Sequence, residues 1–279
     1  MDPTFVAWLG VFAYLVAIFG FFSAWKKTGD QGSVSRTRGP ILALGVLAVL
    51  LHGLNAFKPL MWPPHLDFGF LSTLSLVILL INLMLLVGSL IKPIDKLLIV
   101  TFPLGSLVLA LRASLHESVH PIDSPSLELE LHIFSSLVAF SFLSISAIQA
   151  SLIALQDACL RKRDPGGVVI RSLPSLQSME TLLFQLIAAG LLFLTVSLAS
   201  GFLFIEDMSA QHLAHKTLLS ILAWCLFASL LFGRLRFGWR GPMAIRWTLG
   251  GFLALLLAYF GSKLVLELIL RKSWSLNSD

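Results

Sequence analysis

The sequence predicts an all-α polytopic membrane helix bundle with about eight transmembrane helices. The chain has 279 residues, of which 57% are hydrophobic and only 13% are charged, whereas soluble domains carry about 25% charged residues. Its mean hydropathy is +0.88. A soluble fold of this size could not bury so much apolar surface in one core. We therefore expect a single integral membrane domain over residues 1–279.

Eight apolar runs, each rich in Leu, Ala, Phe and Val, are long enough to cross a bilayer, which requires about 20 apolar residues per helix. None shows the alternation of apolar and polar residues that a membrane β-barrel strand requires. In chain order, the predicted spans are 5–25, 39–57, 69–91, 96–113, 131–155, 182–204, 217–235 and 245–269. The first run lacks the basic lead and the small-residue cleavage site of a signal peptide, so we expect it to remain as a span.

The distribution of Lys and Arg predicts the orientation, because basic loops resist translocation across the membrane. Fourteen of the 20 basic residues lie in or beside the segments after spans 1, 3, 5 and 7: Lys26, Lys27, Arg36, Arg38, Lys92, Lys96, Arg161, Lys162, Arg163, Arg171, Arg234, Arg236, Arg240 and Arg246. The opposite loops carry mostly carboxylates. Both termini are therefore expected outside the cytoplasm. The basic residues are split among short loops with no reading element, which argues against nucleic-acid binding.

With this topology, all seven histidines fall on the outer side of the membrane: His52, His65, His116, His120, His132, His212 and His215. Histidine is the commonest side-chain metal ligand and a natural axial ligand of haem iron. The one-sided set therefore indicates that a metal or haem is handled at this boundary.

His52 is the histidine placed deepest in a span, within the apolar stretch LAVLLHGLNAF. An ionisable side chain inside a span is a candidate functional residue, so we predict that His52 contacts haem or its iron. The alternative is a neutral imidazole that is hydrogen-bonded to a neighbouring helix or to Asn55.

His132 begins the fifth span, ahead of a polar stripe formed by Ser135, Ser136, Ser146 and Gln149. Small residues permit close helix approach, or they leave room for a flat macrocycle. We predict that His132 binds haem iron, and the alternative is a histidine that merely lies at the interface.

His215 opens the seventh span, where the helix dipole disfavours a cation, so we expect a neutral ring able to bind haem. His212 lies three residues earlier, and if this stretch is helical it would lie on the same helix face as His215. His116 and His120 match the pattern H-E-x-x-H, but Pro121 and the polar loop favour solvated histidines over a zinc protease site.

The later half of the chain carries a family resemblance, strongest over residues 130–263. The segments that carry it are LPSLQSMETLLFQLIAAGLLFLTVSLASGFLF and AHKTLLSILAWCLFASLLFGRLRFGWRGPMAIRWTLGGFLALLLAYFGSK. Their most specific parts are GWRG, AYFG and the HxxxSxxxF start of the fifth span. The chain resembles the cytochrome c assembly (haem-handling) membrane protein superfamily. Within it, the chain is similar to a small eight-span inner-membrane branch related to the haem-biosynthesis-associated membrane protein.

This resemblance implies haem near the outer face, held by histidines. His132 matches the first external haem histidine, and His52 resembles the histidine of an early span. The chain departs from the superfamily where a W-G-x-x-W-x-W-D loop is expected, because that stretch reads FIEDMSAQHLAHK. In the superfamily pattern, a later membrane histidine would fall near Phe232 and a last external one near Leu270. This chain has a histidine at neither position. His215 would then replace a lost ligand.

The function predicted from the sequence is haem binding or handling in a bacterial inner (cytoplasmic) membrane, with the lipid bilayer, haem and other cytochrome assembly or membrane proteins as partners. One alternative is a non-catalytic adaptor or regulator with a degenerate haem site, and a less favoured one is a transporter. We expect no catalytic residues, since the sequence shows no Ser-His-Asp order, phosphate loop or paired carboxylate within a span.

Overall fold

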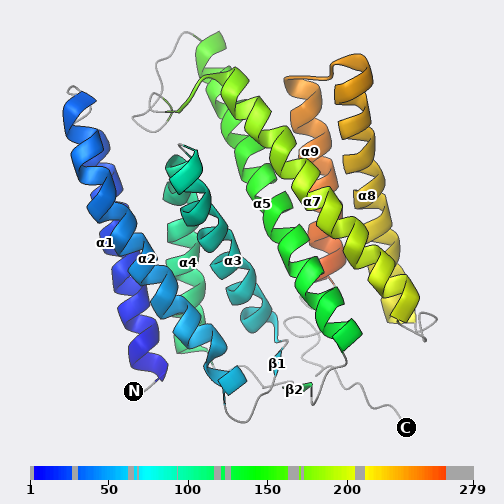
Figure 1. The fold of residues 1–279 in the computed structure, drawn as a ribbon, viewed down its shortest axis with the longest axis horizontal. Coiled ribbons are helices and arrows are strands. Elements are labelled where there is room, and N and C mark those ends of the chain that lie inside the picture. Colours follow the sequence, from blue (N-terminus) through cyan, green and yellow to red (C-terminus); the bar gives the residue numbers. More distant parts are fainter. Residues whose placement is uncertain are drawn as a thin grey trace. The chain divides into compact units, whose positions relative to one another are not determined.

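The computed structural model describes residues 3–26, 31–61, 66–67, 69–92, 94–115, 121–122, 127–162, 170, 173–204 and 211–261. The α-helices in this part of the chain are α1 (Pro3–Lys26), α2 (Gln31–Met61), α3 (Phe70–Ile91), α4 (Leu98–Ser114), α5 (Leu127–Arg161), α7 (Leu176–Phe204), α8 (Gln211–Phe237) and α9 (Pro242–Leu256) (Figure 1). The 3-10 helix η1 (Asp95–Leu97) leads into α4, and the π-helix η2 (Leu257–Gly261) continues α9. Strands β1 (Leu66–Asp67) and β2 (Pro121–Ile122) form one short antiparallel pair.

Eight helices in the described residues are long and apolar enough to cross a membrane: Thr4–Ser23, Gly39–Phe57, Phe70–Ile91, Asp95–Ser114, Leu127–Arg161, Leu176–Leu203, Lys216–Phe237 and Pro242–Gly261. This confirms the prediction of a helical fold with about eight spans. Residues 262–269 of the last predicted span lie outside the described residues. The placement of both termini outside the cytoplasm stays a prediction.

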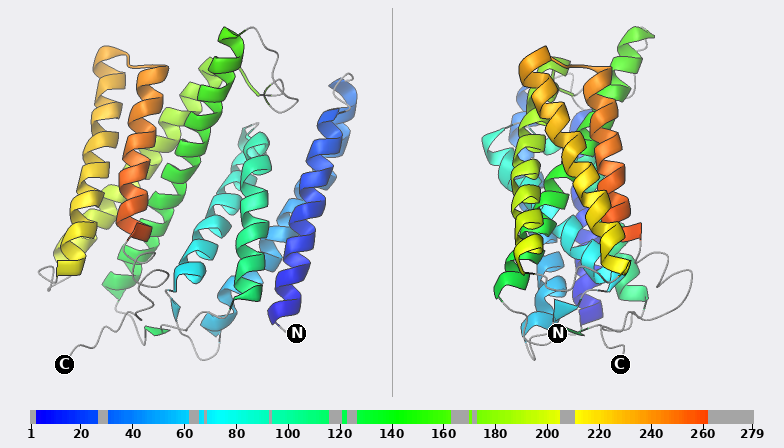
Figure 2. Two further views of the ribbon diagram at one scale, coloured as in Figure 1. Left: turned by 180° about the vertical axis from the view of Figure 1, so that it is seen from behind. Right: turned by 90° about the vertical axis from the view of Figure 1, so that its right-hand side faces the viewer.

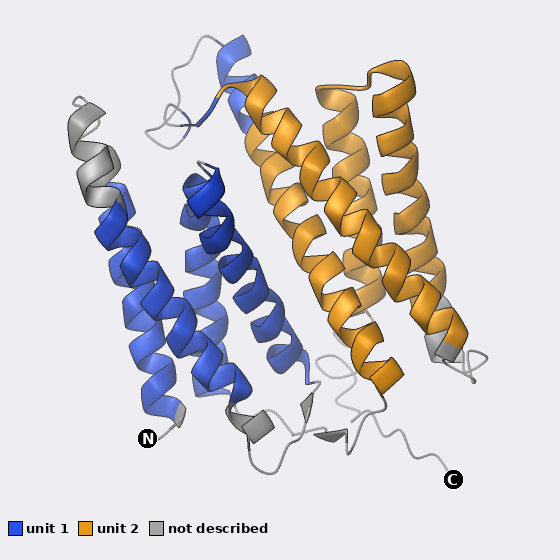
Figure 3. Cartoon of the chain, in the orientation of Figure 1, with its two compact units in different colours: residues 1–123, 155–174 blue, residues 124–154, 175–279 orange. Residues whose placement is uncertain are grey.

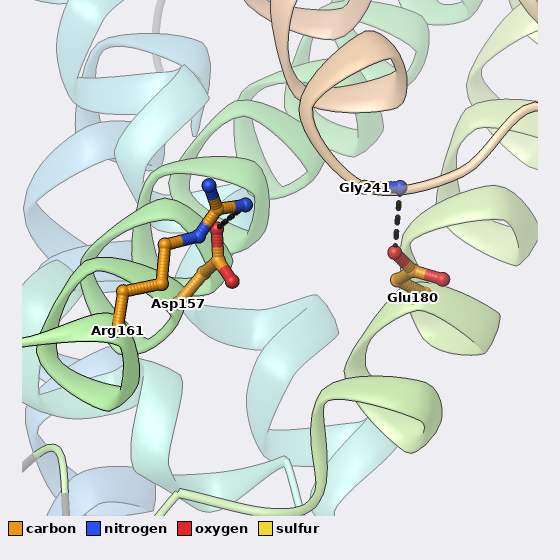
Figure 4. Close-up of polar contacts among 4 residues, drawn as sticks. All are labelled: Asp157, Arg161, Glu180 and Gly241. Atoms are coloured by element: carbon orange, nitrogen blue, oxygen red, sulfur yellow. Dashed lines mark hydrogen bonds and ion pairs between the residues drawn. The ribbon is translucent and has the colours of Figure 1, made fainter. Parts of the chain in front are cut away.

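Helix α5 is longer at both ends than the span predicted from hydropathy, 131–155. Its first turn contains Glu128 and Glu130, and its last turn contains Arg161. Acidic residues near a helix N-terminus and basic residues near its C-terminus interact favourably with the helix dipole. Asp157 also forms an ion pair with Arg161 one turn later, at 2.9 Å (Figure 4). The helix therefore continues through charged residues that hydropathy alone assigns to loops.

Helix α7 likewise begins six residues before the predicted span, and its start carries a local capping signal. The backbone N–H of Ser178 donates a hydrogen bond to Ser175 Oγ at 3.4 Å. Serine at this position satisfies one of the N–H groups that a helix start leaves without a partner. The helix thus begins at Leu176 and not where the apolar run begins.

The chain forms two compact units, shown in different colours in Figure 3. Unit 1 comprises residues 1–123 and 155–174, and unit 2 comprises residues 124–154 and 175–279. Most of α5 therefore belongs with the later helices.

Unit 1 is built from α1 to α4, and α1 packs against both α2 and α4. Tyr14 and Phe102 are fully buried at its centre, with their rings edge to face at 5.2 Å. Glycines allow the helices to approach: a Cβ atom at Gly10 would lie 2.7 Å from Leu109, and one at Gly45 would lie 2.8 Å from Phe102. Small residues are how membrane helices reach close packing.

Unit 2 contains residues 127–154 of α5 together with α7, α8, α9 and η2, and α8 and α9 lie side by side in both views of Figure 2. The ring of Phe140 on α5 lies 4.9 Å from Tyr259 and 5.4 Å from Phe260, both on η2. Helix α7 approaches α5 closely as well, because a Cβ atom at Gly190 of α7 would lie 2.7 Å from Leu143.

The GWRG motif forms the turn between α8 and α9. Gly238 and Gly241 have φ angles of 67° and 55°, which only glycine adopts readily. The ring of Trp239 packs directly on the bare backbone of Gly233. The carboxylate of Glu180 on α7 accepts a 2.8 Å hydrogen bond from the backbone N–H of Gly241 (Figure 4). The turn between α8 and α9 is thus hydrogen-bonded to the start of α7, which connects these three helices at one end of unit 2.

Candidate functional site

His132 lies in the second turn of α5, with its ring against α7. Its Nδ1 atom is 2.9 Å from the carbonyl oxygen of Ser197 and 3.3 Å from Ser200 Oγ. A carbonyl oxygen can only accept a hydrogen bond, so Nδ1 carries the proton and donates it. In the neutral ring, Nε2 then holds a lone pair. Among the residues that the structure describes, none offers Nε2 a hydrogen bond.

The close fit of the His132 ring depends on a glycine of α7. A Cβ atom at Gly201 would lie 3.1 Å from Cε1 and 3.4 Å from Nδ1 of His132. His132 itself is half-buried. Leu131, which precedes it in α5, and Phe202, which follows Gly201 in α7, are exposed apolar residues. The His132 site is therefore a partly exposed imidazole that is held against α7.

His52 on α2 is fully buried in unit 1, and both of its ring nitrogens have partners. Nε2 lies 2.9 Å from Ser75 Oγ on α3, and Nδ1 lies 3.1 Å from the hydroxyl of Tyr14 on α1. To bind iron, His52 would have to give up one of these two hydrogen bonds. The structure shows His52 hydrogen-bonded to two neighbouring helices, and the prediction that it contacts haem or its iron stays a prediction.

Two further side chains extend the hydrogen bonds around His52. Asn82 donates through Nδ2 to the Tyr14 hydroxyl at 3.4 Å, and Arg112 on α4 donates to Ser75 Oγ at 3.4 Å. We call Tyr14, His52, Ser75, Asn82 and Arg112 the unit 1 cluster. All four helices of unit 1 contribute to it.

The comparisons with known proteins point to one family. The family model described as cytochrome C assembly protein matches residues 41–270. The chain belongs to the cytochrome c assembly protein family. The match includes both His52 and His132.

Two relatives match about half of the chain. One is the inner membrane protein YpjD of Escherichia coli strain K12, which is 32% identical over 139 residues, covering 50% of this chain and 52% of that protein. The other is an uncharacterised 28.8 kDa protein in the nifR3-like 5' region of Azospirillum brasilense, 32% identical over 149 residues, covering 53% and 55%. The aligned part thus spans about half the length of these relatives. No solved structure matches the chain.

The remaining histidines of this family member are only partly described. His212 and His215 lie in the first turns of α8, but their side chains are outside the described part, so the prediction that His215 binds haem stays a prediction. His65, His116 and His120 also fall outside the described residues. Among the described side chains, no three His, Cys, Asp or Glu residues are grouped so that they could hold a metal ion together.

Sequence reasoning missed most partners of the two histidines. Tyr14 and Arg112 could have been identified from the sequence as candidate partners, because each is a polar or charged group inside a predicted apolar span. Ser197 acts through its backbone carbonyl, which has no signature in the sequence. Gly201 stands in an ordinary small-residue context, ASG, and only its distance from the ring of His132 reveals its role.

Proposed function

We propose that this protein binds haem at an outer-side site of a bacterial inner membrane and handles it for cytochrome assembly, and that His132 is the residue that would hold the iron, through Nε2. Membership of the cytochrome c assembly family supports the haem assignment. The named Escherichia coli relative is an inner membrane protein, which supports the location. Membrane proteins of cytochrome assembly are then the expected recipients of the haem.

One observation carries the choice of His132: its Nδ1–H is held by the Ser197 carbonyl at 2.9 Å. Metal-binding histidines commonly donate their other ring N–H to a backbone carbonyl, which fixes the tautomer and the ring orientation. The Ser197 carbonyl therefore leaves the Nε2 lone pair available in a fixed direction. A porphyrin supplies four nitrogens to its iron, so the protein needs to provide only one or two ligands.

Haem, when bound, would supply an iron centre with an open coordination site for the imidazole. The residues around His132 have separate tasks in this proposal. Ser197 and Ser200 orient the ring, and Gly201 makes room for it. His52, whose ring nitrogens are both engaged, is not needed as a ligand.

The test is the visible spectrum of the purified protein, expressed with a haem precursor, for wild type and for His132→Gly. We expect a Soret band in wild type, its loss in His132→Gly, and its recovery when imidazole is added to the variant. Rescue by free imidazole separates a missing ligand from a misfolded protein. His52→Gln serves as the matched histidine control and should keep the band.

A wild type that remains colourless after haem addition would overturn the proposal. It would favour the second candidate, a non-catalytic adaptor or regulator of a partner protein. The observation that favours this candidate is the stretch FIEDMSAQHLAHK, which has no tryptophan where the superfamily pattern has a tryptophan-rich loop. The adaptor predicts a co-purifying membrane protein in place of a cofactor.

A further inference from the structure

We propose that the turn between α8 and α9 binds the headgroup of an anionic phospholipid through three arginines, Arg236, Arg240 and Arg246. This site lies toward the membrane face opposite the one proposed for His132. Glu180, which is bonded to the turn, and Ser197, which holds His132, are both on α7. A helix rises by about 26 Å between these two positions, most of the roughly 30 Å of a bilayer core.

The turn must lie at a membrane surface, because it is short and joins two spans. Helix α8, and α9 together with η2, are each long and apolar enough to cross the membrane, and only residues 238–241 separate α8 from α9 (Figure 2). The headgroup layer on each side of the hydrocarbon core is about 5–7 Å deep. Arg236, Arg240 and Arg246 lie in this turn or within about one helical turn of it, so they lie at headgroup depth.

The three arginines are exposed and have no counter-charge in the described part of the chain. No described carboxylate pairs with any of them, and residues 208–266 contain no Asp or Glu. Of the described carboxylates, Glu180 on α7 is the one bonded to this turn, and it accepts the N–H of Gly241 (Figure 4). A phosphate would therefore meet cations alone, whereas the ammonium group of a zwitterionic headgroup would be repelled.

Arg234 has a different role, because its guanidinium is already used within unit 2. It donates a 3.3 Å hydrogen bond to the carbonyl oxygen of Trp239 and lies 4.7 Å from the centre of the Phe184 ring on α7. The two neighbours of Arg240 in the chain, Trp239 and Gly241, are thus both held by hydrogen bonds. A backbone that is fixed before binding lowers the entropy lost when a ligand binds.

The apolar residues beside the arginines suit a lipid better than a free anion. The rings of Trp239 and Trp247 lie 5.3 Å apart, and tryptophan is enriched where membranes meet water. Leu235 and Phe237, on either side of Arg236, are 86% and 66% exposed. A phosphate that carries acyl chains gains apolar contacts there that inorganic phosphate lacks.

The choice of basic residue also favours phosphate recognition. All four basic residues in and beside this turn are arginines, whereas the segment after the third span carries Lys92 and Lys96. Lysine would satisfy the topology rule equally well. A guanidinium binds two phosphate oxygens at once, while a lysine ammonium acts as a point charge. We therefore expect recognition of the phosphate group in addition to attraction by charge.

The experiment is native mass spectrometry of the full chain in an uncharged detergent, which measures the affinity for the first bound lipid. Phosphatidylglycerol is the anionic probe and phosphatidylcholine is the zwitterionic one. We expect wild type to bind phosphatidylglycerol at least about tenfold more tightly, and Arg240→Gln/Arg246→Gln to reduce this preference to about threefold or less. An unchanged affinity for phosphatidylcholine shows that the variant is folded.

Arg161→Gln/Lys162→Gln is the matched control, because it removes two exposed positive charges from the end of α5, and it should keep the full preference. Arg240→Lys/Arg246→Lys keeps the charge but loses the paired phosphate contacts, so it should lose at least about half of the preference. An excess of inorganic phosphate should not displace the lipid.

Equal affinity of wild type for the two lipids would overturn the proposal, as would an unchanged preference in the glutamine or lysine variants of Arg240 and Arg246. Loss of the preference in the α5 control would show an attraction to net charge alone, and displacement by phosphate would show a site for a free anion. Either result would also refute the lipid site. Because the assay contains no haem, its failure leaves the Soret test of His132 unaffected.

Discussion

Gly105→Ala tests the close packing of the unit 1 cluster against α4. The new Cβ atom would lie 2.8 Å from Asn82 Nδ2 and 3.1 Å and 3.3 Å from the ring of Tyr14. The Asn82 amide would have to move by about 0.6 Å to reach ordinary contact, which disturbs its 3.4 Å hydrogen bond to the Tyr14 hydroxyl. Overpacking of this kind costs about 1–3 kcal/mol, and loss of a hydrogen bond adds about 1 kcal/mol.

A matched control separates this clash from the effect of alanine on the helix itself. Gly53 also lies mid-helix in unit 1, and no atom lies within 4 Å of a Cβ added there. Alanine improves helix propensity by about 1 kcal/mol at either site, so the difference between the two variants isolates the packing cost. We expect the thermal midpoint of Gly105→Ala, followed by tryptophan fluorescence in detergent, to fall at least about 2 °C below that of Gly53→Ala. Equal midpoints would refute the packing described for Gly105.

Three further predictions concern the turn between α8 and α9, the hydrogen bond that Glu180 makes to this turn, and the ion pair at the end of α5. The same thermal unfolding assay tests each of them. Gly233→Ala displaces the Trp239 ring and should lower stability by about 1–3 kcal/mol, with a shift in tryptophan emission; an unshifted spectrum would contradict the packing. Glu180→Ala leaves the Gly241 N–H without its acceptor, at a cost of about 1 kcal/mol. Asp157→Ala removes a partly exposed ion pair with Arg161, so its stability should stay within about 1 kcal/mol of wild type; a larger loss would show that the pair is structural.

The eight spans could be predicted from the sequence because bilayer thickness imposes a length on every apolar run. The ends of the helices could not be predicted in this way. Helical backbone hydrogen bonding continues past the apolar stretch where acidic residues lie near the N-terminus and basic residues near the C-terminus, as the helix dipole favours. In α5 this added the turns that contain Glu128 and Arg161.

The histidine sites could be predicted only as single residues. His52 stood out as an imidazole in an apolar run, but its partners Tyr14 and Ser75 are 38 and 23 residues away, on other helices. No local spacing encodes such contacts. For His132, the contact that fixes the ring is made with the backbone carbonyl of Ser197, which lies 65 residues away on α7.

The polar stripe of α5 also shows why a polar pattern overstates the polarity of a surface. Ser135, Ser136 and Ser146 donate to carbonyl oxygens three or four residues earlier in their own helix. Their hydroxyls are therefore satisfied internally, and what they present outward is chiefly small size. Gln149 differs, because it reaches across to the carbonyl of Met179 on α7.

The length of α5 sets the depth at which a ligand would meet His132. The helix has 35 residues and is about 52 Å long, whereas the hydrocarbon core is about 30 Å thick. With the middle of α5 at the bilayer midplane, His132 would lie about 18 Å from that plane, beyond the hydrocarbon and among the lipid headgroups. An amphiphilic ring with two carboxylates could then dock edge-on from the headgroup layer, keeping its charged side in water and its apolar side against the helices.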